Sequence, residues 1–204
     1  MVITIGRQYG SGGRELGKKL ADQLGFDFYD EELVNLAAKK SNMNEEVLKQ
    51  VDEKATRSFL YSLVTGTDIR GLNSPIYYEM PINDKLFIAQ AEIIKELAQK
   101  SNCVIVGRCA DYILRDTDVD CVNLFIYADM EKRIARIMRL YGLARDKAKE
   151  QIVKTEKRRK AYYNYYSNRD WGRMENYHLC IDAGEVGIDN AVELVRDYVL
   201  KKNK

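Results

Sequence analysis

The spacing of hydrophobic positions alternates along the chain between short continuous apolar runs and helical periodicity. The apolar run 2–5 predicts a buried strand, and residues 15–24 have the spacing of an amphipathic helix. Further apolar runs predict strands at 25–30, 103–106, 121–127 and 177–181. Amphipathic stretches predict helices at 31–40, 45–54, 85–100, 110–114, 131–141, 145–166 and 188–200.

This alternation of strands and helices is typical of a parallel sheet, because parallel strands need crossover helices between them. We therefore expect a three-layer α/β/α fold with a five-stranded parallel sheet, in a single domain over 1–204. The pattern is lost between 56 and 83, where glycines, Asn73 and two prolines interrupt short apolar pieces. The region at about 55–84 is therefore predicted to be an irregular, inserted or mobile part of the domain.

The loop between the first predicted strand and helix carries the clearest functional signal. Its sequence is GRQYGSGGRELG from Gly6 to Gly17, with four glycines in the first eight residues. Glycines let the backbone approach an anion, and the N–H groups at the start of the helix point towards it. The phosphate-loop pattern G-x-x-x-x-G-K-S/T is absent, because Arg14 and Glu15 stand about where Lys and Ser/Thr are expected. The alternative interpretation is a tight strand-to-helix turn that binds no ligand.

Polar residues also follow the other predicted strands. Asp30 ends the second strand, Gly107 and Arg108 follow the third, and Arg133 and Arg136 come just beyond the fourth. In open parallel sheets, ligands bind beyond the carboxyl ends of the strands. Together with the glycine loop, these positions predict a phosphate-binding site.

The helix predicted at 145–166 is very basic, which by itself is typical of a solvated face. In a phosphate-binding fold, such a helix can instead close over a triphosphate and direct arginines at the transferred group. Glu156 can orient Arg159 as an i,i+3 partner. The tyrosine cluster at 162–166 suggests base stacking, but packing on the core is the favoured interpretation.

Composition narrows the classes of partner. With 33 basic and 31 acidic residues, the chain gives no reason to expect nucleic-acid binding. No apolar stretch is long enough to cross a membrane and no signal peptide precedes the first strand, so we expect a cytoplasmic protein without membrane contact. Four cysteines without C-x-x-C spacing predict reduced core thiols. The single histidine, His178, predicts no metal site, so Mg²⁺ is expected to arrive with a nucleotide.

Several segments, in their joint order, resemble the cytidylate kinase-like family, a divergent branch beside the bacterial cytidylate kinases. They are VITI with GRQYGSGGRELGKKLADQLGFDFYD, then VIVGRCADYIL, YAD-x-x-x-R-I-A-R and YYNYYSNRDWG. The resemblance spans essentially the whole chain and is weakest at 56–83. It implies a P-loop NTPase-type fold with a helical lid at about 141–175, ATP and Mg²⁺ as cofactors, and a nucleoside monophosphate as the acceptor.

The resemblance also implies roles for the glycine loop. ATP would be bound by Gly10, Ser11, Gly12, Gly13, Arg14 and Glu15. Gly13 falls on the lysine of the bacterial cytidylate kinases, so Arg14, the next residue, is expected to replace that lysine. This exchange is not neutral, since Arg is a rigid fork and Lys a compact charge. Glu15 falls on a threonine, and it can either approach Mg²⁺ or repel the phosphates.

Five further positions are matched in the same way. Asp30 and Arg108 are expected to bind the acceptor, although Cys109 stands where the bacterial cytidylate kinases have an aspartate. The expected catalytic arginines are Arg133 and Arg136 at the entrance of the lid and Arg159 within it, together with Arg14.

The sequence thus predicts an ATP-dependent phosphotransferase of the nucleoside-monophosphate kinase type, with a cytidylate-like acceptor. Because the Lys and Ser/Thr of the phosphate loop are absent, a nucleotide-binding regulatory module without catalysis stays open as the alternative. A kinase for another small acceptor is the second alternative. RNA binding through the basic, tyrosine-rich helix is a weaker third.

Overall fold

The computed structural model describes residues 1–31, 33, 35–37 and 82–202, so the helix predicted at 45–54 and nearly all of the region 55–84 lie outside it. The strands are β1 (Val2–Arg7), β2 (Asp27–Tyr29), β3 (Cys103–Val106), β4 (Cys121–Tyr127) and β5 (Leu179–Asp182). The helices are α1 (Gly13–Leu24), α6 (Ile82–Lys100), α7 (Ala110–Ile113), α8 (Met130–Tyr141), α9 (Arg145–Ser167), the 3₁₀ turn η1 (Met174–Asn176), α10 (Ala183–Val186) and α11 (Ile188–Lys202).

The strands form one parallel sheet in the order β2-β3-β1-β4-β5. The central strand β1 pairs with β3 on one side, where Val2 lies opposite Cys103, and with β4 on the other, where Val2 lies opposite Cys121. All the carboxyl ends therefore lie on one edge of the sheet, and the predicted five-stranded parallel architecture is confirmed.

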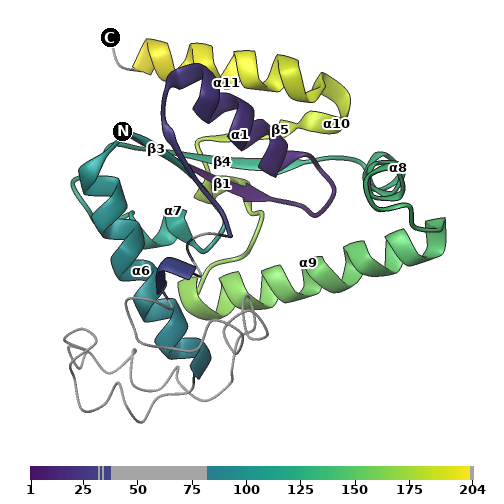
Figure 1. Ribbon diagram of the computed structural model, residues 1–204, viewed down its shortest axis with the longest axis horizontal. Helices are drawn as coiled ribbons and strands as arrows, with labels where there is room; N and C mark the ends of the chain where they lie inside the picture. Colours follow the sequence, from purple (N-terminus) through teal and green to yellow (C-terminus); the bar gives the residue numbers. More distant parts are fainter. Residues whose placement is uncertain (32, 34, 38–81, 203–204) are drawn as a thin grey trace.

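Helices cover both faces of the sheet (Figure 1). One face packs against α1 and α11 through a core that includes Ile3, Ile5 and Val104. The other face packs against α6, α7 and α9 through a core that includes Cys103 and Ile105. Alternate side chains of one strand thus enter opposite cores, which is what a strand buried on both faces requires. The predicted three-layer α/β/α fold is confirmed.

The last strand differs from the prediction at both ends. The strand begins at Leu179, two residues later than expected. Before it, His178 forms two hydrogen bonds with Asn123 of β4, one of them through its side chain. The backbone N–H of His178 donates to the carbonyl of Asn123 (2.7 Å), and Nδ1 of His178 accepts from the N–H of Asn123 (2.8 Å). At the last residue of the strand, Asp182 caps the short helix α10 by accepting hydrogen bonds from the N–H groups of Gly184 and Glu185. The sequence analysis did not predict this four-residue helix.

The tyrosine cluster packs on the core, as the favoured interpretation expected. Tyr162, Tyr163 and Tyr166 are buried, and the ring of Tyr166 stacks on Phe87 with a centroid distance of 4.0 Å. The hydroxyl of Tyr166 donates to Asp84 Oδ1 at the first turn of α6 (2.7 Å). These contacts fix the carboxyl end of α9 against α6.

Two further findings concern the helices and the cysteines. No helix in the described part of the chain is long and apolar enough to cross a lipid bilayer. All four cysteines are free thiols, and burial raises the pKa of Cys103 to about 11. Cys180, however, is exposed and is therefore not a core thiol.

Candidate active site

The glycine loop joins the central strand to α1 and leaves the start of that helix without a side-chain cap. Gly10 (φ +84°) and Gly12 (φ +90°) have left-handed backbones, and Gly12 is the N-cap residue. Ser11 is turned inwards, and its hydroxyl donates to the carbonyl of Gln8 (2.9 Å). Because no side chain takes up the first N–H groups of α1, these groups can bind an anion.

Close packing behind the loop also requires glycine at these positions. A Cβ at Gly12 would lie 2.7 Å from Cδ1 of Ile188, at the start of α11. A Cβ at Gly10 would lie 3.1 Å from the Cβ of Arg133, on α8. The loop is therefore held between two helices.

In front of the loop lies a cavity of about 820 Å³, which we call the loop cavity. It brings together most of the predicted site residues, namely Gly10, Gly12, Gly13, Arg14, Glu15, Asp30, Arg136 and Arg159. Its walls also carry Arg7, Lys18 and Lys19, so cations outnumber the acids Glu15, Asp30 and Glu31 in its lining. A cavity of this size and charge suits a ligand with several phosphates. Three of the predicted site residues, Ser11, Arg108 and Arg133, do not line this cavity.

Asp30, at the carboxyl end of β2, faces two arginines from the glycine loop. Its Oδ2 accepts a hydrogen bond from Nε of Arg14 (2.5 Å), and its Oδ1 lies 3.8 Å from Nη2 of Arg7. Asp30 is buried, whereas Arg14 is 66% exposed. Arg14 thus reaches from the start of α1 towards the end of β2, with the rest of its guanidinium at the rim.

Glu15 is held by two cations on the other side of the loop. Its Oε2 accepts a hydrogen bond from Nη2 of Arg136, and its Oε1 lies 3.3 Å from Nζ of Lys19. The bond from Arg136 lowers the pKa of Glu15, so this carboxylate is ionised at neutral pH. The acid that stands in place of a hydroxyl is therefore paired with one of the predicted catalytic arginines.

The other two predicted arginines are held in different ways. Arg133 is buried and donates from Nη1 to Oε1 of Glu156 (2.5 Å), which ties α8 to α9. Arg159 donates from Nη1 to the carbonyl of Arg7 (3.2 Å) and lies over the ring of Tyr9. The expected pairing of Glu156 with Arg159 is thus wrong, because the side chain of Glu156 is turned towards α8.

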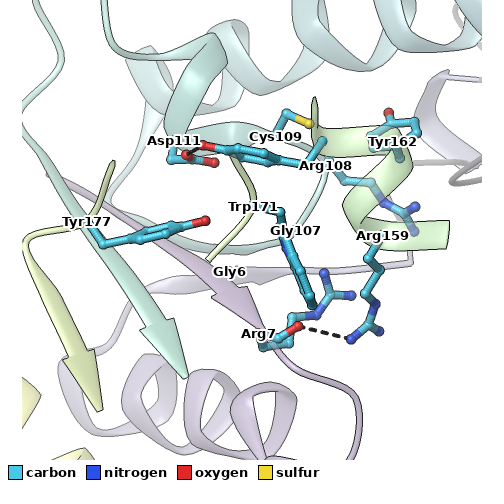
Figure 2. Close-up of a pocket in the computed structure, with 11 residues that line it drawn as sticks. Gly6, Arg7, Gly107, Arg108, Cys109, Asp111, Arg159, Tyr162, Trp171 and Tyr177 are labelled. Atoms are coloured by element: carbon cyan, nitrogen blue, oxygen red, sulfur yellow. Dashed lines mark hydrogen bonds between the residues drawn. The ribbon is translucent and has the colours of Figure 1, made fainter. Parts of the chain in front are cut away.

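A second cavity, of about 30 Å³, lies beside the end of β3, and we call it the small cavity. Arg108 lines it and is buried with a left-handed backbone (φ 58°). Arg7 and Arg159 line both cavities. Figure 2 shows the guanidinium groups of Arg7, Arg108 and Arg159 gathered on one side of the small cavity.

The walls of the small cavity include polar groups that the sequence analysis did not single out. Asp111 is buried on α7 and its Oδ2 accepts from the hydroxyl of Tyr163 (2.6 Å). Burial raises the pKa of Asp111. Tyr177 and Trp171 complete the wall (Figure 2). Asp111 could have been found from the sequence, because it follows a predicted strand end, as Arg108 does.

Arg7 was missed for a different reason. It belongs to the glycine loop segment, but the pattern of a phosphate loop directs attention to the residues after the last glycine. The structure places its side chain 11% exposed, at the junction of the two cavities. The available signal was its position at the carboxyl end of the central strand.

The described residues contain no group of three or more His, Cys, Asp and Glu side chains that could hold a metal ion. Glu15 is the carboxylate of the glycine loop that lines the loop cavity.

Two cytidylate kinases are similar to this chain in sequence. The cytidylate kinase 2 of Borreliella burgdorferi is 30% identical over 108 residues, 52% of this chain and 58% of that protein. This chain thus matches less than two thirds of that relative's length. A cytidylate kinase of Saccharolobus islandicus is 23% identical over 199 residues, 98% of this chain and 90% of that protein.

Solved structures share the fold. An uncharacterized protein from Eubacterium ventriosum superposes with a TM-score of 0.72 and 28% identity, covering 98% of both chains. Shikimate kinase from Bacteroides thetaiotaomicron has a TM-score of 0.56 and 15% identity, again over 98% of both chains, so the two chains share the α/β/α fold. A model of the cytidylate kinase-like family matches residues 2–185, nearly the whole chain. The protein therefore belongs to the cytidylate kinase-like family.

Proposed function

We propose that the protein is an ATP-dependent phosphotransferase that phosphorylates a nucleoside monophosphate, with a cytidylate-like acceptor favoured. One observation carries the proposal: the glycine loop opens into a cavity of about 820 Å³ with cations from β1, α1, α8 and α9 in its walls. Phosphoryl transfer needs positioning and electrostatic stabilisation more than covalent chemistry, and this arrangement suits both.

The glycine loop is the proposed site for the phosphates of ATP. Its backbone from Gly10 to Gly13 approaches the cavity without side chains, apart from the inward Ser11, and the N–H groups of α1 add a positive end. Arg14 is proposed to contact phosphate through the exposed part of its guanidinium. A bound Mg²⁺ would neutralise phosphate charge, and Glu15 is the loop carboxylate that can meet it.

The acceptor is proposed to lie between the ends of β2 and β3. Asp30 would position it rather than remove a proton, because a phosphate acceptor already carries its nucleophilic oxygen. Arg108 would bind it from the small cavity, with Arg7 and Arg159 between the two cavities. Cys109 beside Arg108 is the reason why an acceptor other than cytidylate is kept as an alternative.

Three arginines are proposed to stabilise the transferred group. Arg136 and Arg159 face the loop cavity and can meet developing charge directly. Arg133 would act from behind, by fixing α9 through Glu156. The segment 141–175, which contains α9, is proposed to be the lid of a single domain over 1–204. The region 55–84 is proposed to lie on the acceptor side. The protein is proposed to be cytoplasmic.

A regulatory module that binds nucleotide without transfer is the second candidate. One observation favours it: Arg14 and Arg136 are both paired with carboxylates, Asp30 and Glu15, rather than directed freely at the loop. These ion pairs must break before either arginine can donate all of its hydrogen bonds to a phosphate.

Nucleotide binding and transfer distinguish these candidates. The purified protein is tested by calorimetry for binding of ATP with Mg²⁺, and by phosphoryl transfer to CMP, dCMP, UMP, AMP and GMP. We expect ATP binding and transfer to CMP or dCMP. Transfer to a non-nucleotide hydroxyl instead would indicate another acceptor, binding without transfer would indicate the regulatory module, and no binding of any nucleotide would overturn both.

A further inference from the structure

Tyr9 connects the glycine loop to the paired helices α8 and α9. The first half of α9 packs on α8 through a small core, made of Ile134, Ile137, Ala148 and Ile152. The ring of Tyr9 packs on this core from the glycine loop. The second half of α9 is held in a different way, through its tyrosines against α6. Tyr9 is therefore a contact through which the loop can fix the first half of α9.

The hydroxyl of Tyr9 bonds to both helices. It accepts a hydrogen bond from Nε2 of Gln151 on α9 (2.9 Å). Burial, and after it a hydrogen bond with Tyr141 at the end of α8, raises the pKa of Tyr9 to about 12. The hydroxyl is therefore neutral at physiological pH, so it can donate one hydrogen bond while it accepts another.

The ring of Tyr9 contacts Arg159, one of the arginines proposed to meet the transferred group. The guanidinium of Arg159 lies over this ring, 5.5 Å from its centroid, which is within the range of a cation–π contact. Nη1 of Arg159 also donates to the carbonyl of Arg7, as Figure 2 shows. Tyr9 and Arg159 both line the loop cavity. The segment that leads into the glycine loop thus contacts Arg159 twice.

The two contacts of Tyr9 with α9 lie far apart along the helix. Gln151 and Arg159 are separated by eight residues, which is about 12 Å along the helix axis. A helix that is held at two points two turns apart resists both sliding and rotation. The hydroxyl and the ring of Tyr9 together therefore fix how far Arg159 reaches into the loop cavity.

On these grounds, and resting on the proposed function, we propose that Tyr9 is a positioning residue that holds Arg159 at the loop cavity. The loop that would bind the phosphates of the donor nucleotide thereby also places an arginine that would contact the transferred group. The effect on turnover exceeds the effect on binding, because Arg159 is needed most where negative charge develops in the transition state.

The test compares Tyr9→Phe and Tyr9→Leu, each in the unaltered chain and together with Arg159→Gln. Tyr9→Phe keeps the ring beneath Arg159, whereas Tyr9→Leu removes the ring and the hydroxyl. Tyr112→Leu is the matched control, because Arg115 lies over the ring of Tyr112 (4.3 Å to the centroid) and neither residue lines the loop cavity or the small cavity.

Three quantities are measured for every variant. Calorimetry gives the affinity for a non-hydrolysable ATP analogue with Mg²⁺, and kcat is measured with the acceptor that the unaltered protein phosphorylates fastest. Thermal unfolding checks that each variant is folded. If Tyr9→Leu does not fold, Tyr9→Met takes its place, because methionine adapts to irregular spaces in a core.

We expect Tyr9→Leu to lower kcat by about tenfold or more and the affinity for the analogue by about threefold. Tyr9→Phe should lower kcat by about threefold, since the ring still supports Arg159. Together with Arg159→Gln, Tyr9→Leu should cause little further loss of either quantity, because it acts through Arg159. Tyr112→Leu should change both quantities by less than about twofold.

The outcomes separate this inference from the proposed function. If the unaltered protein binds the analogue but phosphorylates no acceptor, the proposed function fails, and the affinities of the single and double variants decide the inference. If it binds no nucleotide, both fail. If Tyr9→Leu leaves kcat and the analogue affinity unchanged, or if its losses add in full to those of Arg159→Gln, the inference alone fails.

Discussion

The loop cavity and the small cavity share Arg7 and Arg159 but hold their acids differently. At the loop cavity, Glu15 is paired with Arg136 and Lys19 close to solvent, and it is 42% exposed. Ion pairs of this kind contribute little to stability and are readily exchanged for another anion.

At the small cavity, Asp111 is buried and receives the hydroxyl of Tyr163. Removal of the Tyr163 hydroxyl would take one hydrogen-bond donor from a buried acid, which is costly, so this contact is fixed. The comparison indicates that the ion pairs at the loop cavity can be exchanged, whereas the contact at the small cavity holds α7 and α9 together.

The largest effect is expected from Gly107→Ala, because Gly107 lines the small cavity and packs against Arg7, which lines both cavities. Its left-handed backbone costs about 1–2 kcal/mol for alanine, and the added Cβ collides with Arg7. The free energy of unfolding, measured in urea, should fall by about 2 kcal/mol or more, and ATP affinity should fall with it.

Gly142→Ala is the matched control for this variant. Gly142 is also left-handed (φ +66°), but a Cβ there would meet nothing within 4 Å. The free energy of unfolding of Gly142→Ala should fall only by the cost of a left-handed backbone for alanine, and its ATP affinity should not change. Equal decreases in unfolding free energy and ATP affinity in the two variants would show that the contact between position 107 and Arg7 contributes to neither.

Tyr163→Phe should separate the cavities. Loss of the hydroxyl that donates to Asp111 should lower the free energy of unfolding by about 1–3 kcal/mol, while ATP affinity stays within about twofold since Tyr163 does not line the loop cavity. Tyr162→Phe, which removes a longer bond to the neutral Gln90 (3.3 Å), should lose less stability. A large loss of ATP affinity in Tyr163→Phe would contradict the separation.

Glu15→Gln should have a smaller effect on stability, below about 1 kcal/mol, because its ion pairs are half-exposed. ATP binding without Mg²⁺ should tighten by about threefold, since Arg136 is released and a negative charge leaves the loop. Glu131→Gln, which breaks the exposed pair with Arg145, is the control. Weaker ATP binding seen only with Mg²⁺ would instead indicate that Glu15 supports the metal ion.

The pH dependence of unfolding should show opposite signs for the two acids. The pKa of Glu15 is lowered in the folded protein, so its contribution to stability is present above about pH 4.3, the unfolded value, and is lost as the pH falls. The pKa of Asp111 is raised, so its contribution is full below about pH 3.9 and is lost as the pH rises through the folded value.

Unfolding in urea between pH 3 and 7 tests this difference. Relative to the unaltered protein, Glu15→Gln should lose most stability near neutral pH, and Asp111→Asn should compare best there. If the two variants showed the same dependence of unfolding free energy on pH, burial would not raise the pKa of Asp111.

The sheet could be predicted from the sequence because most strands are short, largely apolar runs and each is followed by a stretch of helical spacing. The runs at 103–106 and 121–127 gave the bounds of β3 and β4 directly. The start of β5 could not be predicted, since it depends on how His178 bonds across to Asn123. Tertiary bonding of this kind has no local signal.

The positions of candidate site residues could be predicted better than their partners. Asp30 at the end of β2 and Arg136 on the helix after β4 line the same cavity, because parallel strands end on one edge of the sheet. The pairing of Glu156 with Arg133 depends on how α9 lies on α8, which helical spacing within α9 does not encode. The contact of the Arg7 guanidinium with Gly107 joins two distant segments and needed the structure.

The central position of β1 has a consequence for dynamics. Its backbone is bonded on both sides, to β3 and to β4, and the glycine loop continues directly from it. Amide hydrogens of residues 3–5 should therefore exchange with solvent only through global opening of the sheet. The strand that holds the glycine loop then stays formed as long as the molecule is folded. Any additional protection from hydrogen exchange on nucleotide binding should be found in the surrounding helices rather than in β1.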